Sequence, residues 1–332
     1  RYLQEGVIRS ALATAALLVG LAGCAASPPL ADGLPTGMPR SLELRGTPFF
    51  PQEEFQCGPA ALATVLRASG VEVQPDGLAP QVYLPGRHGS LQAELIAATR
   101  RQGRLAYLLP GDGQALLSEL DAGRPVLLLQ NLGVKQIPIW HYAVLVGYDA
   151  DRNVALLRSG RRERLKMRWQ RFARSWHDAG RWAMTTLAPG VIPAQSDAAR
   201  YLESVAGMEA AGDRRAATVS YDAAIARWPD EPMAWLGLGN VSYADGDRAA
   251  AADAYSRAAT LAPANAAVRN NLAQVLADAG CLEEAQLQLE RAVTLAAGTA
   301  LAATVEATRA GITADRQANS VQCGLPDRHW PD

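Results

Sequence analysis

Two residues that lie far apart in the chain could together form a nucleophile and its base. Cys57 begins a segment with helical periodicity, in the run Gln56-Cys57-Gly58-Pro59-Ala60. A thiol at a helix N-terminus faces the positive end of the helix dipole, which favours the thiolate. His141 opens an apolar, strand-like run, and an imidazole within hydrogen-bond reach of a cysteine completes the pair that nucleophilic catalysis needs. Only the fold can bring these two residues together.

The elements that would position this pair alternate between helix and strand over residues 46–190. Early helices followed by an antiparallel sheet are typical of an α+β domain. Ser90 is expected to cap the second helix, because serine is a favoured N-cap residue. Periodicity and turn residues predict helices at 57–69, 90–101, 112–121 and 169–176, and strands at 42–44, 105–109, 126–129, 142–148, 154–157 and 181–187.

A repeat with a fixed period follows over residues 198–297. Gly212, Gly246 and Gly280 are 34 residues apart, and so are Pro229 and Pro263. This period is the signature of tetratricopeptide repeats, in which two helices form each repeat and three repeats make a stable stack. Residues 298–332 are expected to form a capping helix and a tail. The sequence therefore predicts an all-α solenoid whose concave surface binds a protein partner.

Two further cysteines lie in this C-terminal part. In an oxidising compartment, Cys281 and Cys323 could form a disulfide that ties the tail onto the third repeat.

The first 23 residues have the layout of a secretory signal, with basic Arg1 and Arg9 ahead of a short apolar stretch. Leu21-Ala22-Gly23-Cys24 resembles a bacterial lipobox, in which the Cys24 thiol carries a diacylglycerol. The alternative is an ordinary signal peptide with an incidental cysteine. The lipobox implies a lipid-anchored protein of the bacterial cell envelope, on the outer membrane and facing the periplasm. Residues 24–45 are proline-rich and predict an unfolded tether that holds the body away from the bilayer.

Composition excludes several classes of function. The net charge of −1 over 332 residues argues against a nucleic-acid binder, which would carry a basic excess. No His-Glu-x-x-His or paired Cys-x-x-Cys spacing is present, and no phosphate-binding Gly-x-x-x-x-Gly-Lys-Ser/Thr loop, so no metal and no cofactor is expected. A basic run at 158–174 is either a solvated face or a patch that touches anionic lipid headgroups or an acidic substrate.

The candidate motifs also resemble a known family. Gln52, the run Cys57-Gly58-Pro59-Ala60-Ala61-Leu62 and the run from His141 to Asp149 resemble the papain-like peptidases that cut bacteriocin leaders after double glycine. They are similar in particular to free-standing lipoprotein relatives that carry tetratricopeptide repeats. The resemblance covers residues 46–190 and implies a papain-like cysteine peptidase domain. It also implies that Gln52 donates to the oxyanion together with the Cys57 backbone N–H, with Gln56 as the second choice.

One position departs from the family pattern. Where the family has an Asp or Asn that orients the imidazole, this chain reads Leu157-Arg158-Ser159-Gly160. Ser159 could accept from the ring, and Asp149 is the other candidate. Without a carboxylate, the imidazolium is less stabilised.

The sequence therefore favours a lipoprotein cysteine peptidase that acts on a peptide or protein. The alternative is a non-catalytic binding scaffold with a degenerate papain-like domain. A third option is a transferase that uses the same Cys–His pair.

Overall fold

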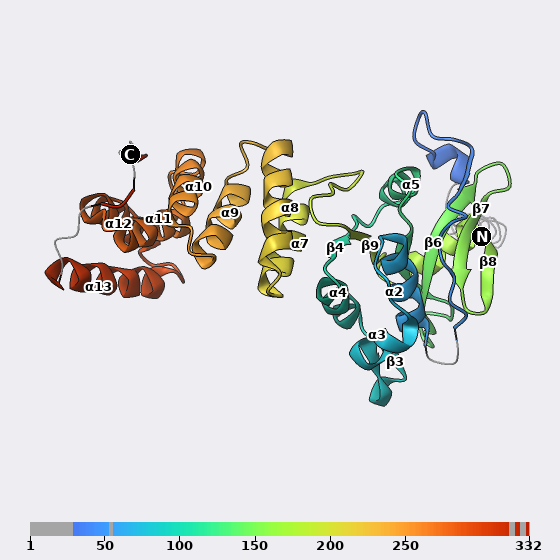
Figure 1. Ribbon diagram of the computed structural model, residues 1–332. Helices are drawn as coiled ribbons and strands as arrows, with labels where there is room; N and C mark the ends of the chain where they lie inside the picture. The colour runs from blue at the N-terminus through green and yellow to red at the C-terminus, as the bar shows by residue number, and fades with distance from the viewer. Residues whose placement is uncertain (1–28, 53–55, 319–322, 326–329, 332) are drawn as a thin grey trace, which may run out of the picture.

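The computed structural model describes residues 29–52, 56–318, 323–325 and 330–331. A sheet domain lies at one end, and a stack of helices extends from it to α13 (Figure 1). This is the predicted architecture, an α+β domain followed by an all-α solenoid. The predicted signal peptide and Cys24 lie outside the described residues. Among the residues described, no helix combines the length and apolar character needed to cross a bilayer.

A seven-stranded antiparallel sheet forms the centre of the first domain. Its order is β4-β9-β5-β6-β7-β8, and β1 pairs with the distal part of β6. Gly147 in β6 lets β1 come close, since a Cβ there would lie 2.2 Å from the Leu42 carbonyl oxygen. The strands are β1 (Ser41–Glu43), β4 (Leu105–Leu108), β5 (Val126–Asn131), β6 (Trp140–Asp149), β7 (Val154–Ser159), β8 (Arg162–Arg168) and β9 (Ala183–Leu187).

Helices cover both faces of this sheet. One face packs against α2 (Cys57–Ala68), α3 (Pro75–Val82) and α4 (Gln92–Arg101). The other packs against α5 (Gly113–Asp121) and α6 (Trp169–His177). Side chains of β6 alternate between the two cores, because successive strand residues point to opposite faces. Tyr142 and Val144 belong to the α2 side, and Ala143 and Leu145 to the α6 side.

Several local predictions differ from the structure. Ser90 does not cap α4: it lies in β3 (Gly89–Ser90), which pairs with β2 (Tyr83–Leu84), and Leu91 occupies the N-cap position. Three further elements were not predicted, namely α3, the β2–β3 hairpin and β8, since short or strongly polar segments carry a weak periodic signal. Most of β8 is exposed and its residues are mainly basic, so it has too few apolar side chains to indicate a strand.

The C-terminal helices form three antiparallel pairs and a seventh helix. Gly212, Gly246 and Gly280 follow the first helix of each pair with φ of 91°, 83° and 82°, a conformation that favours glycine. The pairs are α7 (Ala198–Ala210) with α8 (Arg214–Arg227), α9 (Pro232–Ala244) with α10 (Arg248–Leu261), and α11 (Ala266–Asp278) with α12 (Leu282–Ala296). Helix α13 (Ala302–Ala318) contacts both α11 and α12, as expected of a cap.

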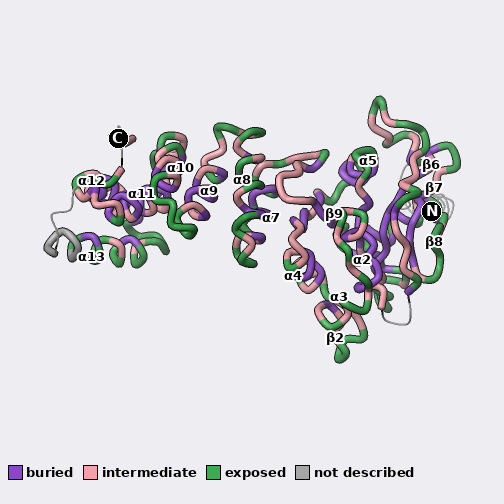
Figure 2. The backbone as a smooth tube through the Cα atoms, viewed as in Figure 1, coloured by how far each residue is buried: buried purple, intermediate pink, exposed green. Residues whose placement is uncertain are grey.

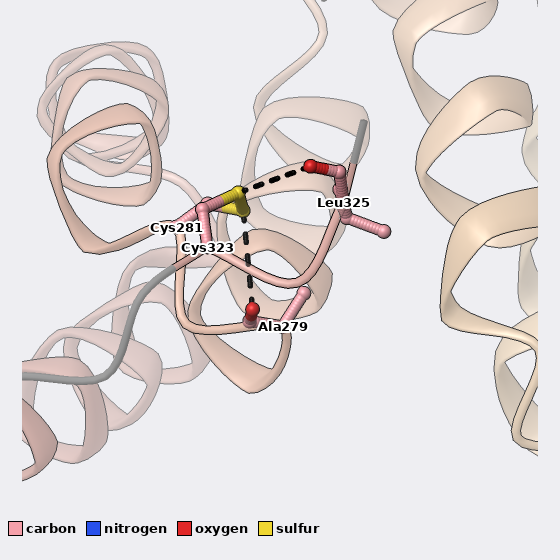
Figure 3. The surroundings of a disulfide bond; sticks show 4 residues. All are labelled: Ala279, Cys281, Cys323 and Leu325. Carbon is pink, nitrogen blue, oxygen red and sulfur yellow. Dashed lines mark hydrogen bonds between the residues drawn. A yellow bond between two sulfur atoms is a disulfide. The ribbon is translucent and has the colours of Figure 1, made fainter. Parts of the chain in front are cut away.

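The third repeat replaces a helix cap with a disulfide. Asp213 and Asp247 cap α8 and α10 by accepting hydrogen bonds from backbone N–H groups. Cys281 holds the equivalent position in the third repeat, makes no side-chain cap and is bonded to Cys323 (Figure 3). This confirms the predicted disulfide. The tail beyond it returns to the stack, where the Pro331 carbonyl accepts hydrogen bonds from buried Arg269 and Gln288, among others.

The first repeat shares a hydrophobic core with the sheet domain. Tyr201 and Val205 of α7 belong to the same buried cluster as Leu105 and Tyr107 of β4. The Tyr107 hydroxyl also donates to the Gln195 carbonyl in the connecting segment. Buried residues follow the inner sides of α7 and β9, where the domains meet (Figure 2). The two domains are therefore packed together, and not merely linked.

The segment before β1 differs from the predicted tether. A short 3-10 helix, η1 (Leu30–Gly33), packs on the domain with Leu30 only 1% exposed. The Leu30 backbone N–H donates to Asn153 Oδ1 at 2.9 Å. Leucine burial therefore holds the chain against the sheet domain from residue 29 onward, and the unfolded-tether prediction is wrong for this part.

Candidate active site

Cys57 is the first residue of α2 and is half-buried. Its sulfur lies close enough to β6 for the Tyr142 backbone N–H to hydrogen-bond it. It lines a cavity of about 680 Å³ that also contains Ser90, Leu91 and Trp140. A peptide carbonyl in this cavity could therefore reach the sulfur.

The residues after Cys57 explain how α2 starts here. A Cβ on Gly58 would lie 2.2 Å from Ser90 Oγ, so only glycine lets the β3 strand approach the helix this closely. Pro59 is tolerated in the first turn, because its missing N–H would have no intrahelical partner there.

His141 is held by Ser159, as one of the two sequence-based alternatives predicts. Its Nε2 lies 2.9 Å from Ser159 Oγ, at the end of β7. This contact leaves Nδ1 as the ring nitrogen for a thiol. Asp149 lies at the opposite end of β6, about 26 Å along the strand from His141, and its carboxylate accepts from the Arg152 N–H in the following turn. Asp149 is therefore too distant to orient the imidazole.

Gln52 is fixed beside the same strand end. Its backbone N–H donates to the Gly160 carbonyl, and its side-chain Oε1 accepts from the Gly160 N–H, both at 3.0 Å. The side chain is buried. Because Oε1 accepts the Gly160 N–H, the side-chain NH₂ of Gln52 is the group that could donate to a substrate oxyanion. Gln56, the second choice, occupies the N-cap position of α2 without a side-chain cap bond.

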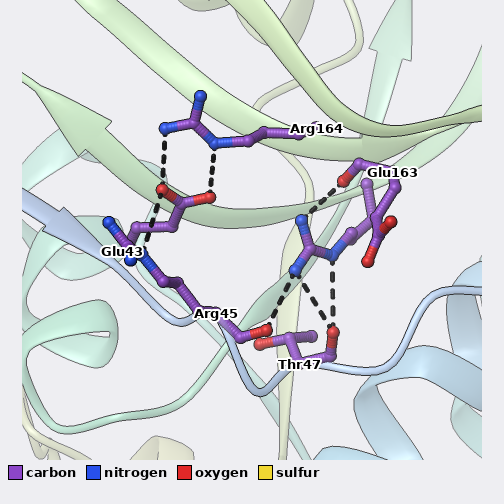
Figure 4. Close-up of polar contacts among 6 residues, drawn as sticks. Glu43, Arg45, Thr47, Glu163 and Arg164 are labelled. Atoms are coloured by element: carbon purple, nitrogen blue, oxygen red, sulfur yellow. Dashed lines mark hydrogen bonds and ion pairs between the residues drawn. The ribbon is translucent and has the colours of Figure 1, made fainter.

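Buried Arg158 supports the turn that carries Ser159 and Gly160. Its guanidinium donates to the Thr47 and Glu163 carbonyls, which ties the β7–β8 hairpin to the segment after β1 (Figure 4). Arg164 reinforces this connection through two hydrogen bonds to Glu43, at 2.7 and 2.8 Å. Arg158 is only 4% exposed, so this member of the basic run is a buried support and not part of a surface patch.

The pKa shifts at this site do not favour the thiolate that is expected for a cysteine at a helix N-terminus. Burial raises the pKa of the Cys57 thiol, although backbone N–H groups of Tyr142 and Gly58 oppose the shift. Burial also lowers the pKa of His141. Both shifts favour the neutral thiol and the neutral imidazole, because desolvation disfavours a charged form. Among the described residues, no hydrogen bond joins the Cys57 sulfur to the His141 ring.

Two residues of the cavity were missed by the sequence analysis. Trp140 is 54% exposed. Its position directly before the candidate catalytic histidine is the sequence signal that could have indicated it. Ser90 reaches the cavity through the unpredicted β2–β3 hairpin, which no sequence pattern indicated. His88 lies in the turn of this hairpin with φ of 48°, and it also lines the cavity.

Comparisons with known proteins agree with this architecture. Residues 45–184 match the model of the Peptidase_C39 like family. The match supports a papain-like, C39-like peptidase fold for the sheet domain. No curated protein matches the chain.

Solved structures are also similar to parts of this chain. A C39-like peptidase from Bacillus anthracis is 18% identical with a TM-score of 0.38, over 44% of this chain and 97% of that one. The type III secretion translocator chaperone SycD of Yersinia enterocolitica is 21% identical with a TM-score of 0.34, over 36% and 85%. The MamA protein is 19% identical with a TM-score of 0.30, over 36% and 70%.

Proposed function

We propose that this protein is a cysteine peptidase of the cell envelope that cleaves peptide bonds by acyl transfer. The observation that carries the proposal is the convergence of three chain segments at one end of β6. His141 bonds Ser159, Gln52 bonds the adjacent Gly160, and Cys57 lies against Tyr142. The family match over residues 45–184 supports the same chemistry.

The proposed reaction starts from a neutral pair. The Cys57 sulfur attacks the peptide carbonyl carbon while its proton passes to His141 Nδ1, so no preformed thiolate is required. The Gln52 NH₂ and the Cys57 backbone N–H stabilise the oxyanion. His141 returns the proton to the leaving amine as the C–N bond breaks, and water then hydrolyses the thioester. Ser159 acts as a positioning residue that holds the ring orientation.

The cellular setting is part of the proposal. Cys24 would carry the lipid anchor that holds the protein on the outer membrane, facing the periplasm. The tetratricopeptide stack would bind the substrate or a partner protein, because such stacks present extended concave surfaces.

The decisive experiment compares Cys57→Ala with the unchanged protein on a peptide mixture, with new termini identified by mass spectrometry. Cleavage by the unchanged protein and none by the variant is expected. Ser69→Ala, at the other end of α2, is the matched control and should cleave normally. Cleavage that persists in Cys57→Ala would refute the mechanism. Added amines test the transferase option, since a transferase would give amide products.

A non-catalytic scaffold remains the second candidate. The neutral serine in the orienting position and the two pKa shifts favour it. A scaffold would bind peptides without releasing new termini, and Cys57→Ala would leave that binding unchanged.

A further inference from the structure

An apolar hairpin tip projects from the sheet domain next to the candidate site. It connects β5 to β6, and a bridge between Val134 and Ile137 closes it. The side chains of Val134, Ile137, Ile139 and Trp140 are each more than half exposed. Exposed apolar residues in contiguous groups mark surfaces that contact a partner or a membrane.

Three arginines lie beside this hairpin. Arg168 ends β8 and occupies the N-cap position of α6, and Arg171 and Arg174 follow in the helix. All three are exposed, and their spacing of three residues places them on one side of α6. They line a cavity of about 790 Å³ together with Leu132 and Gly133 at the base of the hairpin. Asp178 lines the same cavity, but its ion pair is with His177. Within the described part of the chain, no ion pair joins the three guanidinium groups to a carboxylate, and three positive charges face this one negative charge. The positive charge on this side is therefore available to an anionic partner.

The N-terminal segment enters the domain on the same side. Pro29 lines the same cavity, and the next residue, Leu30, is buried in the core. Leu30 is six positions after Cys24, a separation that spans at most about 20 Å even in a fully extended chain. A lipid on Cys24 would therefore hold this side of the domain close to the bilayer.

We propose that the hairpin 132–140, together with Arg168, Arg171 and Arg174, forms a membrane face that docks on anionic phospholipid. The apolar side chains enter the interfacial region, and the arginines bind headgroup phosphates. This inference rests on the proposed lipid anchor only for its orientation argument. The exposed apolar side chains, the arginines and the cavity that joins these arginines to the base of the hairpin are independent of the anchor.

The membrane face also decides where the candidate active site opens. Trp140 belongs to the hairpin and lines the Cys57 cavity as well. Docking therefore brings the mouth of this cavity to the bilayer surface. The substrates reached there are peptide segments that emerge from the membrane or lie along it.

The test places a polarity-sensitive fluorophore on the hairpin of the full-length, lipidated protein. Ile137→Cys is labelled in a Cys57→Ser background, so that the introduced thiol is the one that reacts. The matched control is Val219→Cys on α8, a half-exposed apolar position far from the hairpin. Vesicles containing phosphatidylglycerol should give a blue shift, with quenching by a lipid-borne nitroxide, at position 137 and not at 219.

A second experiment tests how much the positive charge of the three arginines contributes to membrane binding. Replacing Arg168, Arg171 and Arg174 by glutamine should weaken the shift at position 137 and make it independent of phosphatidylglycerol. Each arginine near an anionic surface contributes about fivefold in binding, so the triple replacement should lower the affinity of the hairpin for the vesicle about a hundredfold.

Several results would overturn the membrane face. One is that the fluorophore at position 137 shows no more blue shift or quenching than the fluorophore at position 219 with any of the vesicles. Another is a label that responds to added peptide but not to lipid, which would make the hairpin a substrate surface. Mass spectrometry of Cys24 shows whether this residue carries a lipid, and so tests the proposed anchor separately from the membrane face. An unlipidated protein that still shows the shift at 137 refutes the anchor and supports the membrane face.

Discussion

Opening the Cys281–Cys323 bond should destabilise the third repeat by a predictable amount. The bond joins residues 42 positions apart. In the chain-entropy treatment of cross-links, a closed segment of that length restricts the unfolded chain by about 4 kcal/mol at 25 °C. Cys323→Ser removes the bond and leaves the buried Cys281 side chain in place. We expect this variant to lose close to that full amount.

Two replacements of Cys281 distinguish the stability contributed by the disulfide from the stability contributed by a helix cap. Cys281→Ala removes the disulfide and leaves α12 uncapped. Cys281→Asp also removes the bond but restores the residue found at the equivalent positions, Asp213 and Asp247. An N-cap of this type contributes about 1 kcal/mol. The aspartate variant should therefore be less stable than the unchanged protein and more stable than the alanine variant by about that difference.

The assay is native-state hydrogen exchange of the α11 and α12 amides, with and without a thiol reductant. Reductant should accelerate exchange in the unchanged protein and have no effect on Cys323→Ser. Cys57→Ser is the control, because it removes a thiol outside this repeat and should respond to reductant like the unchanged protein. A difference below about 1 kcal/mol between Cys323→Ser and the oxidised protein would show that this bond does not restrict the unfolded chain as argued.

Three further predictions follow from the sheet domain. Leu30→Ala should lower the free energy of unfolding by about 3 kcal/mol, because Leu30 is fully buried, whereas exposed Asp32→Ala should change the denaturant midpoint little. Ser159→Ala should lower kcat/KM about fivefold, the worth of one neutral hydrogen bond, and change its pH profile, whereas Cys57→Ala should abolish cleavage. Burial lowers the pKa of His141, so the folded state binds a proton less readily than the unfolded chain. Stability should therefore fall as the pH drops below about 6.5, and urea midpoints should show a smaller fall in His141→Gln.

Strong local patterns predicted most of the architecture. The 34-residue spacing predicted the helix pairs, because each repeat needs a glycine at the same turn. The alternation after His141 predicted β6, since a buried strand of this length leaves a clear apolar run. The family resemblance indicated Ser159 as one of two candidates to contact His141, and its Oγ lies 2.9 Å from the ring Nε2.

The remaining features depend on contacts that no local pattern shows. Ser90 looks like a helix cap, but pairing with Tyr83 draws it into a strand. Arg158 looks like part of a basic surface, but it is buried, and it donates to the carbonyl of nearby Glu163 and to that of Thr47 in a distant segment. Leu30 stands in a proline-rich stretch that resembles a linker, and only the cavity it fills in the folded domain explains its burial.

The shared core between β4 and α7 has a consequence for any client of the repeats. Because Tyr201 and Val205 are buried among sheet-domain residues, the helical stack cannot swing freely about the connecting segment. A polypeptide gripped along the stack would be presented to the sulfur in a constant direction and at a constant separation. The fixed distance between the stack and Cys57 would then contribute to specificity. The bond that is cleaved would depend on how far it lies from the segment bound by the stack, as well as on the side chains next to the bond.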